Sequence, residues 1–245
     1  MSIFSFFKRK RQPAKDSKRK FSRVLGLALS GGGAKGFAHV GVLRAFEEEG
    51  LDFDIVVGTS AGSIVGALYS AGVDTFKMEE VGKTLKTSDF LDRKILVTPS
   101  KSENIENFVK NVIGDIEFKD LNKKFACSAT NMLNGEEVVL TDGTVAKAVS
   151  ASCSAPIFFD GVDIDGMRLY DGGLVNNLPS DIARRMGADF VVGVTLSNTG
   201  VAGTDKTNFI SKVAFLPSST PGWLKVSMLS IAPAYAVCNS NKNNN

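Results

Sequence analysis

Two short apolar runs, each followed by a glycine-rich turn and a helix pattern, dominate the first part of this sequence. Residues 24–29 are continuously apolar, which is typical of a strand covered on both faces, and Asp54-Ile-Val-Val57 is a second short run that fits a buried strand. Ser30-Gly-Gly-Gly-Ala-Lys-Gly36 follows the first run, and Gly58-Thr-Ser-Ala-Gly62 follows the second. We therefore expect an α/β fold, a three-layer sandwich with a mostly parallel central sheet flanked by helices on both faces.

The downstream sequence adds elements of both kinds. Asn134-Gly135 lies between two strand patterns, and Asp165-Gly166 is the turn of a hairpin pattern. Pro179 and Gly187 bracket a short helix pattern, since proline suits a helix start and glycine a helix end. The expected elements are helices within 74–124, strands at 125–130 and 137–141, a helix at 146–151, a hairpin over 160–170, a helix over 179–186 and a strongly buried strand at 190–196.

The composition fits one folded domain with a basic extension. The chain has 245 residues, of which 43% are hydrophobic and 22% charged, and this excludes a collagen, a fully disordered chain and a heptad coiled coil. We expect a flexible arm at 1–23, a folded domain at 24–237 and an Asn-rich disordered tail at 238–245. The apolar stretch 226–237 is too short to cross a membrane, because a spanning helix needs about 20 apolar residues.

The basic charge is concentrated in the arm, which carries nine lysines and arginines against one aspartate. Its tip holds Phe4, Phe6 and Phe7, followed by the basic run Lys8–Lys20. A secretory signal has the opposite order, so we expect a cytoplasmic protein. The rings suit burial at the inner face of a membrane, where each nearby cation adds about 1 kcal/mol of attraction to anionic lipid. A solvated tail is an equally weighted alternative, and no nucleic acid is expected because nothing downstream has the pattern of a nucleic-acid-binding fold.

Ser60 is the strongest candidate nucleophile. The segment Gly58-Thr-Ser60-Ala-Gly62 fits the pattern G-x-S-x-G and stands directly after a buried strand and before a helix. On such a turn the serine has a strained backbone and its hydroxyl projects from the sheet edge, while Gly58 and Gly62 leave room for close backbone passage. The helix N-terminus directs its positive end at developing negative charge. A serine that only caps the helix is the weaker alternative in this context.

Three functions are considered for the glycine loop: a dinucleotide site, a P-loop and an oxyanion hole. Gly31-x-Gly33-x-x-Gly36 matches a dinucleotide fingerprint, but the acidic residues that could bind a ribose precede the second strand instead of ending it. A P-loop is excluded because no Gly-Lys-Ser/Thr follows. In an oxyanion hole, the successive glycines Gly31, Gly32 and Gly33 let backbone N–H groups converge on an anion, and each donor is worth about 3 kcal/mol in a transition state. The nucleophile turn one strand–helix unit later favours this third function.

A serine nucleophile needs a proton acceptor. His39 is the only histidine and lies within an apolar helix pattern, where a packed histidine bonded locally is the better expectation. Asp171 is the best carboxylate candidate, because it follows a strand pattern and precedes two glycines that let a neighbouring chain approach. An aspartate with the ordinary pKa of about 3.9 is a weak base, so its site should be partly dry. From the residues alone, this role and that of a turn-forming Asp-Gly are about equally supported.

No metal or cofactor is expected. Cys127, Cys153 and Cys238 lie far apart without a C-x-x-C spacing, so the sequence indicates neither a disulfide framework nor a typical zinc site. With a single histidine, a histidine-rich metal cluster is excluded as well.

Four blocks of sequence, taken together, resemble the patatin-like phospholipases. The likeness runs in order from about Val24 to Leu196, and four blocks in order are far more specific than any one of them. The blocks are Ser30-Gly-Gly-Gly-Ala-Lys-Gly36 with Ala38-His-Val-Gly-Val42, Gly58-Thr-Ser-Ala-Gly62, Ala151-Ser-Cys-Ser-Ala-Pro156 and Asp171-Gly-Gly-Leu-Val-Asn-Asn-Leu-Pro179.

The resemblance implies a Ser–Asp dyad without histidine, in which Ser60 is the nucleophile, Asp171 the base and the Gly31–Gly33 backbone the oxyanion hole. It also implies calcium-independent hydrolysis of acyl esters in phospholipids, lysophospholipids or neutral lipids. We therefore expect a serine esterase that acts on acyl lipids through an acyl-enzyme. The alternative is a catalytically weak or inactive membrane-associated module that binds lipid on the same scaffold, because residues 197–245 show no family pattern. A dinucleotide-binding oxidoreductase is a third and weaker candidate.

Overall fold

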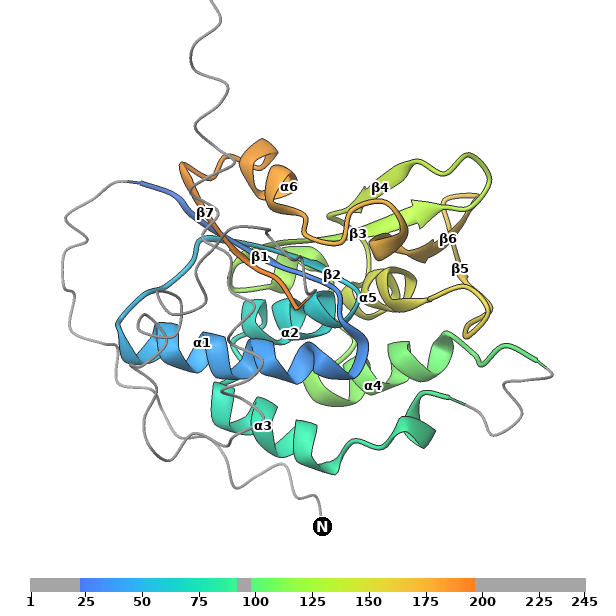
Figure 1. Ribbon diagram of the computed structural model, residues 1–245, viewed down its shortest axis with the longest axis horizontal. Coiled ribbons are helices and arrows are strands. Elements are labelled where there is room, and N and C mark those ends of the chain that lie inside the picture. Colours follow the sequence, from blue (N-terminus) through green and yellow to red (C-terminus); the bar gives the residue numbers. More distant parts are fainter. Residues whose placement is uncertain (1–22, 92–97, 197–245) are drawn as a thin grey trace, which may run out of the picture.

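The computed structural model describes residues 23–91 and 98–196. A mostly parallel sheet with helices on both faces runs through this part of the chain, so the expected fold class is confirmed (Figure 1). Nearly all of the basic arm, the apolar stretch 226–237 and the Asn-rich tail lie outside the described residues, and their structure stays a prediction.

Strands and helices follow one another along the described chain in the order that the sequence predicts. The strands are β1 (Leu25–Leu29), β2 (Ile55–Thr59), β3 (Lys124–Asn131), β4 (Glu137–Leu140), β5 (Val162–Ile164), β6 (Met167–Asp171) and β7 (Phe190–Val194). The α-helices are α1 (Ala38–Glu48), α2 (Ala61–Ser70), α3 (Thr75–Thr84), α4 (Glu103–Ile113), α5 (Val145–Cys153) and α6 (Ser180–Arg185). Short 3-10 turns are η2 (Gly33–Phe37), η3 (Thr87–Asp89), η4 (Phe118–Asp120) and η5 (Gly172–Leu174).

Parallel pairing holds the centre of the sheet together. β1 pairs in parallel with β2 and β7, and β2 pairs in parallel with β3. β4 and β6 are antiparallel to β3, and β5 is antiparallel to β6. The predicted turn of the β5–β6 hairpin is confirmed: Asp165 and Gly166 have φ angles of 50° and 75°, the left-handed pair that a two-residue type I′ turn requires.

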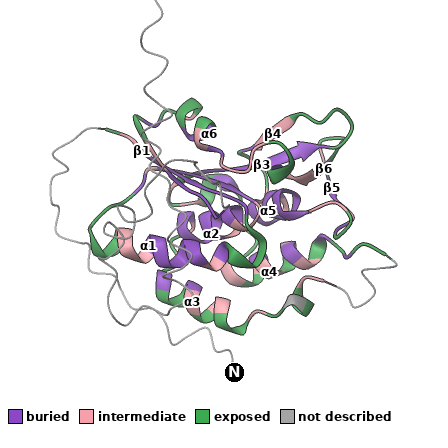
Figure 2. Ribbon diagram, in the orientation of Figure 1, coloured by how far each residue is buried: buried purple, intermediate pink, exposed green. Residues whose placement is uncertain are grey.

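Both faces of the sheet are buried under helices. α1, α2 and α5 cover one face, and α3 and α4 pack on these helices from outside, whereas α6 lies on the other face (Figure 1). Side chains of β2 alternate between the faces, so Val56 joins the larger core while Ile55 and Val57 pack with Ile182 of α6. Figure 2 shows that α2, α5 and the central strands are almost wholly buried. Continuous apolar runs therefore mark these strands because the protein covers them on both sides.

β7 differs from the strongly buried strand that the sequence predicts. Only its last two residues, Gly193 and Val194, are buried, while Phe190 is 40% exposed. Among the described strands β7 pairs with β1 alone, so it forms an edge of the described sheet. The guanidinium of Arg23 lies 5.0 Å from the centre of the Phe190 ring and covers part of this edge.

The turn between β2 and α2 is a single residue long, because β2 ends at Thr59 and α2 begins at Ala61. Ser60 between them has φ 51° and ψ −125°, outside the regions that side chains favour. Two glycines make room for this turn. A Cβ atom on Gly58 would collide with the carbonyl oxygen of Gly62, and one on Gly62 would collide with that of Leu29. The expected strained turn and its two glycines are thus present.

Replacement of Ser60 by glycine should give a more stable protein than replacement by alanine. Strain of this kind costs of order 1–3 kcal/mol, and glycine removes it because it lacks a Cβ atom. Glycine also costs about 0.5–1 kcal/mol more in backbone entropy on folding. We therefore expect the free energy of unfolding of Ser60→Gly, measured in urea, to be about 1 kcal/mol higher than that of Ser60→Ala. At Ser180, the first residue of α6, the order should be reversed, with alanine the more stable. Equal stability of the two Ser60 variants would contradict the strain.

Candidate active site

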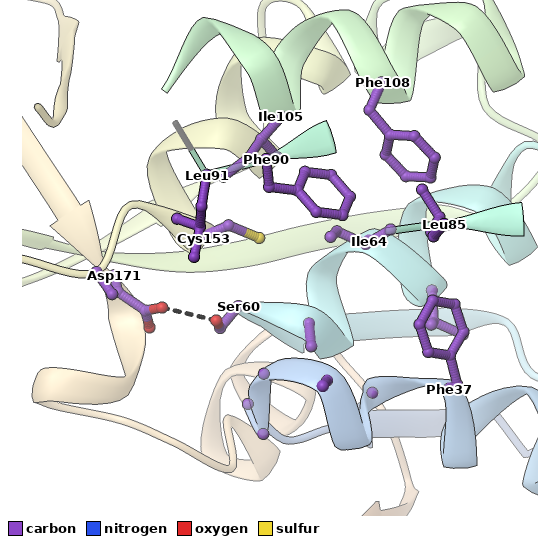
Figure 3. Close-up of a pocket in the computed structure, with 18 of the residues that line it drawn as sticks. Phe37, Ser60, Ile64, Leu85, Phe90, Leu91, Ile105, Phe108, Cys153 and Asp171 are labelled. Atoms are coloured by element: carbon purple, nitrogen blue, oxygen red, sulfur yellow. Dashed lines mark hydrogen bonds between the residues drawn. The ribbon is translucent and has the colours of Figure 1, made fainter. Parts of the chain in front are cut away.

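Ser60 and Asp171 meet side chain to side chain. The Oγ atom of Ser60 donates a 2.6 Å hydrogen bond to Oδ2 of Asp171, across 111 positions of sequence (Figure 3). Sheet register explains the meeting: Thr59 at the end of β2 pairs with Ser128 of β3, and Asp171 at the end of β6 pairs with Ala129. β4 pairs with both of these β3 residues as well, so it occupies the opposite edge. β2 and β6 therefore follow one another along the same edge of β3, and their C-terminal ends meet.

Hydrogen bonds on three sides fix Asp171. Its Oδ1 accepts the N–H of Gly173 at 2.7 Å, which leaves Oδ2 for Ser60. Its own N–H donates to the carbonyl of Ser154 at 2.9 Å, and its carbonyl accepts the hydroxyl of Thr130 at 2.9 Å. A Cβ atom on Gly172 would collide with the backbone of β3, so the close approach expected beside Asp171 is present. The carboxylate is therefore oriented by the backbone and held toward one partner.

The site of Asp171 is partly dry. Burial raises the pKa of its carboxyl above the ordinary aspartate value, while the hydrogen bonds from Ser60 and Gly173 act in the opposite direction. Burial is the larger influence because removal from water disfavours the charged form. A carboxylate with a raised pKa is a stronger base than one with the ordinary value, and this agrees with the partly dry site expected for Asp171.

Two further serines hold the backbone of Ser60. Its N–H donates to Oγ of Ser152 at 3.0 Å, and its carbonyl accepts the hydroxyl of Ser63 at 2.6 Å. Sequence reasoning gave neither residue a role. Ser152 belongs to the block Ala151–Pro156, which carried part of the family resemblance, but no local pattern shows that this block lies against the nucleophile turn.

The glycine loop lies beside the dyad and is only partly available to a ligand. The N–H of Gly31 already donates to the carbonyl of Asn177 at 3.1 Å. Within residues 23–91 and 98–196, the N–H groups of Gly32, Gly33 and Ala34 donate no hydrogen bond. Gly32 and Gly33 are exposed, and both line the cavity that contains Ser60. The N–H of Gly31 is therefore occupied, and the three-glycine oxyanion hole stays a prediction that only the amides after Gly31 could serve.

His39 has a packing role, as expected. Its side chain is fully buried, and Nε2 donates a 2.8 Å hydrogen bond to the carbonyl of Ser30 at the start of the glycine loop. Burial lowers the pKa of His39 to about 4, so the ring is neutral near pH 7. The ring therefore anchors the end of β1.

An apolar cavity of about 610 Å³ opens beside Ser60. In Figure 3 it runs from Ser60 and Asp171 along α2 toward Phe37, Leu85 and Phe108. Apolar side chains of α2, α3 and α4, and of residues 85–91 that follow α3, line much of it. Such a cavity, mostly apolar and with Ser60 and Asp171 at one end, suits a long apolar ligand that carries one reactive polar group.

The position of Asp54 does not suit a dinucleotide site. A ribose-binding carboxylate would have to lie near the glycine loop, but Asp54 accepts the N–H of Leu25 at the start of β1, at the opposite edge of the sheet. In the part of the chain that the structure describes, no three His, Cys, Asp or Glu residues gather to hold a metal ion. No helix among the described residues has both the length and the apolar surface to cross a bilayer.

Comparison with known proteins adds relatives and a structural neighbour. Lysophospholipase nte1 of Aspergillus fumigatus is 32% identical over 191 residues, which cover 74% of this chain and 12% of that protein. Patatin-like phospholipase domain-containing protein 7 of Mus musculus is 34% identical over 195 residues, which cover 76% of this chain and 14% of that protein. This chain thus spans about an eighth of the length of these relatives.

VipD from Legionella pneumophila has a similar crystal structure, with a TM-score of 0.59 and 16% identity over 78% of this chain and 52% of VipD. At that identity the likeness concerns the fold. Residues 27–184 match the family model described as patatin-like phospholipase, which covers more than half of the chain and contains both Ser60 and Asp171. The chain belongs to the patatin-like phospholipase family.

Proposed function

We propose that this protein is a lipid acyl hydrolase that cleaves carboxylic esters of phospholipids, lysophospholipids or related acyl lipids. The 2.6 Å hydrogen bond between Ser60 and a partly dry Asp171, at the mouth of an apolar cavity, carries the proposal. Family membership and relatives named as a lysophospholipase and a patatin-like phospholipase agree with it. The cavity accepts the acyl chain, and the ester group lies at the dyad.

In the first half of the reaction, Oγ of Ser60 attacks the ester carbonyl carbon while Oδ2 of Asp171 takes its proton. The carbonyl oxygen becomes an oxyanion, which the N–H groups of Gly32 and Gly33 stabilise together with the positive end of α2. The tetrahedral intermediate then collapses. The bond to the alcohol oxygen breaks, and that oxygen leaves with the proton from Asp171.

In the second half, water attacks the acyl-enzyme carbonyl as Asp171 accepts a proton from it. A second tetrahedral intermediate forms at the same oxyanion site. When it collapses, the bond between the acyl carbon and Oγ of Ser60 breaks, the fatty acid leaves, and the proton on Asp171 returns to Ser60. Asp171 is thus the base in each addition step and the acid in each elimination step.

An aspartate can replace the usual histidine here for two physical reasons. Burial raises its pKa, which narrows the gap in proton affinity between the carboxylate and the attacking hydroxyl or water. The N–H of Gly173 also fixes its orientation, so little free energy is spent on ordering it during the reaction.

Ser60→Ala and Asp171→Asn should each lower kcat/KM for a soluble medium-chain p-nitrophenyl ester by about a thousandfold or more. The first variant lacks the nucleophile, and the second lacks the proton acceptor at nearly unchanged volume. A fluorophosphonate probe should label wild-type protein at Ser60, which mass spectrometry of the labelled peptide would identify.

Asp163→Asn is the matched control, since Asp163 lies on the same hairpin but is exposed and paired with Arg168. It should keep wild-type activity. Full activity in either dyad variant would refute the roles proposed for these residues. Wild-type protein that binds liposomes but neither reacts with the probe nor cleaves any ester would instead identify a lipid-binding module.

Activity should be lost on the acid side as the pH falls through the pKa of Asp171, because a protonated carboxyl cannot accept the serine proton. Since burial raises this pKa, the midpoint should lie above the ordinary aspartate value of about 3.9. His39 should add no inflection near pH 6.5, because burial lowers its pKa to about 4. The profile of kcat/KM against pH for the soluble ester measures both points, and an inflection near pH 6.5 that a His39 variant removes would contradict the histidine-free dyad.

The basic arm suggests a cytoplasmic protein with peripheral contact to an anionic membrane face. Deletion of residues 1–20 should lower the fraction that sediments with anionic vesicles at low salt, and the difference should shrink at high salt because ions screen the lysines and arginines. Neutral vesicles serve as the control. Equal sedimentation of the deleted and full chains at low salt would assign the arm no membrane role.

A further inference from the structure

Exposed apolar side chains gather at one edge of the molecule. Nine large apolar residues are exposed in the described chain, and six of them follow the C-terminal ends of β3, α5 and β6. The other three are Leu51 before β2, Phe190 at the start of β7, and Phe76 in α3. We call the six the apolar rim: Met132, Leu133, Ile157, Phe158, Leu174 and Val175.

The apolar rim borders the dyad. Ser154, whose carbonyl binds the N–H of Asp171, precedes Ile157 by three residues. Leu174 directly follows Gly173, whose N–H binds the carboxylate of Asp171. The β3–β4 hairpin, the segment after α5 and the β5–β6 hairpin lie on the right-hand side of Figure 1, while the α1–β2 connection and the start of β7 lie on the left. The rim thus belongs to the edge where the dyad lies.

The rim is also continuous with the cavity. Phe158 is half exposed, and it lines the same cavity as Ser60 and Asp171. Phe158 therefore joins the rim to the cavity that contains Ser60. Soluble proteins rarely gather exposed apolar residues in this way unless the patch binds a partner or a membrane.

Ile157 is presented outward at a cost to the fold. Its side chain is 82% exposed, and its φ angle of 75° is one that a β-branched residue rarely adopts. The surrounding turn is well anchored: Phe159 donates to the carbonyl of Ala155 at 3.0 Å, and Ser100 donates to the carbonyl of Phe158 at 2.8 Å. Within the described chain nothing covers Ile157 to compensate for this conformation. Strained residues of this kind cluster at functional surfaces.

Two cations near the rim are paired with carboxylates, and the exposed Glu136 and Asp165 lie in the neighbouring hairpin turns. Arg168 pairs with Asp163 on the neighbouring strand, and Lys101 pairs with Asp160 close to the turn of Ile157. The rim therefore offers apolar contact without a net preference for anionic headgroups, unlike the basic arm.

We infer that the apolar rim docks this protein on a lipid bilayer, with its side chains in the interfacial layer and the mouth of the cavity facing the acyl chains. This inference rests on the proposed function for its biological sense, since a lipid hydrolase must reach substrate that is held in a membrane. Its evidence is the position and exposure of the rim, the strain at Ile157, and the place of Phe158 in the cavity wall.

The test compares two double variants of the full chain. Ile157→Asn with Leu174→Ser removes apolar surface from the rim, and Leu51→Ser with Phe76→Ser removes similar surface elsewhere. Neutral phosphatidylcholine vesicles at high salt suppress any contribution of the arm. Because each large side chain contributes about tenfold or more to burial in an apolar phase, the rim variant should partition onto these vesicles at least about tenfold less than wild type. The control variant should partition like wild type.

A second readout separates docking from chemistry. The rim variant should hydrolyse a soluble short-chain ester within about twofold of wild type but cleave vesicle lipid about tenfold more slowly, in line with its weaker partition. The single variant Ile157→Asn should melt at or above the wild-type temperature, because asparagine adopts a left-handed backbone more readily than isoleucine. Weaker binding by that variant then has no explanation in a damaged fold.

Several results would overturn the inference. The first is that wild-type protein does not bind neutral vesicles, and the second is that the rim and control variants bind them equally well. The third is that wild-type protein is a dimer that the rim substitutions convert to a monomer, which would make the rim an interface between copies. Failure of the proposed function is distinguishable: wild-type protein would cleave no ester, yet the rim variant would still lose vesicle binding.

Discussion

Everything at the site depends on how β3 pairs along one of its edges. β2 ends opposite Ser128 and β6 ends opposite Ala129, so two strands that run in opposite directions stop at adjacent positions of a third. A slip of β6 by one residue would turn the side chain of Asp171 to the other face of the sheet. The type I′ turn at Asp165–Gly166 opposes such a slip because turn geometry fixes hairpin register. A turn far from the dyad thus helps to place its carboxylate.

The site holds two features that weaken the fold. Ser60 has a strained backbone, and Asp171 is charged in a partly dry place. Because the folded state raises the pKa of Asp171, it binds that proton more tightly than the unfolded chain does. The protonated carboxyl of Asp171 therefore stabilises the fold fully at a pH below the pKa that it has in the unfolded chain. This stabilisation is lost as the pH rises through the pKa that it has in the folded protein. Near neutral pH the buried cores on the two faces of the sheet must offset both costs, and α2 and α5, which carry or contact the dyad, are accordingly almost wholly buried.

Local patterns predicted the elements and singled out Ser60 and Asp171 as candidates, but they did not predict the surroundings of these two residues. The strand–glycine–helix order and the Asp165–Gly166 turn could be predicted because each depends on neighbours in sequence. For Asp171, spacing alone left a catalytic and a turn-forming role open, and only the resemblance favoured one. The use of the Gly31 amide by Asn177, the partial exposure of β7 and the cavity could not be predicted, because each depends on which distant segments become neighbours. The apolar residues of the rim gave no periodic signal, since they lie in turns.

The cavity and the rim address one physical problem. Transfer of an acyl chain from a bilayer to water costs about 0.8 kcal/mol of free energy for each methylene, or roughly 8 kcal/mol for ten of them. The concentration of free lipid in solution is therefore very low, and an enzyme that used only this lipid would bind almost none. A cavity whose mouth is surrounded by side chains such as Ile157 and Phe158 lets the chain pass from one apolar environment to another, so little of that cost arises. Under this inference, the strain at Ile157 is a small loss of folding stability set against a much larger barrier to substrate entry.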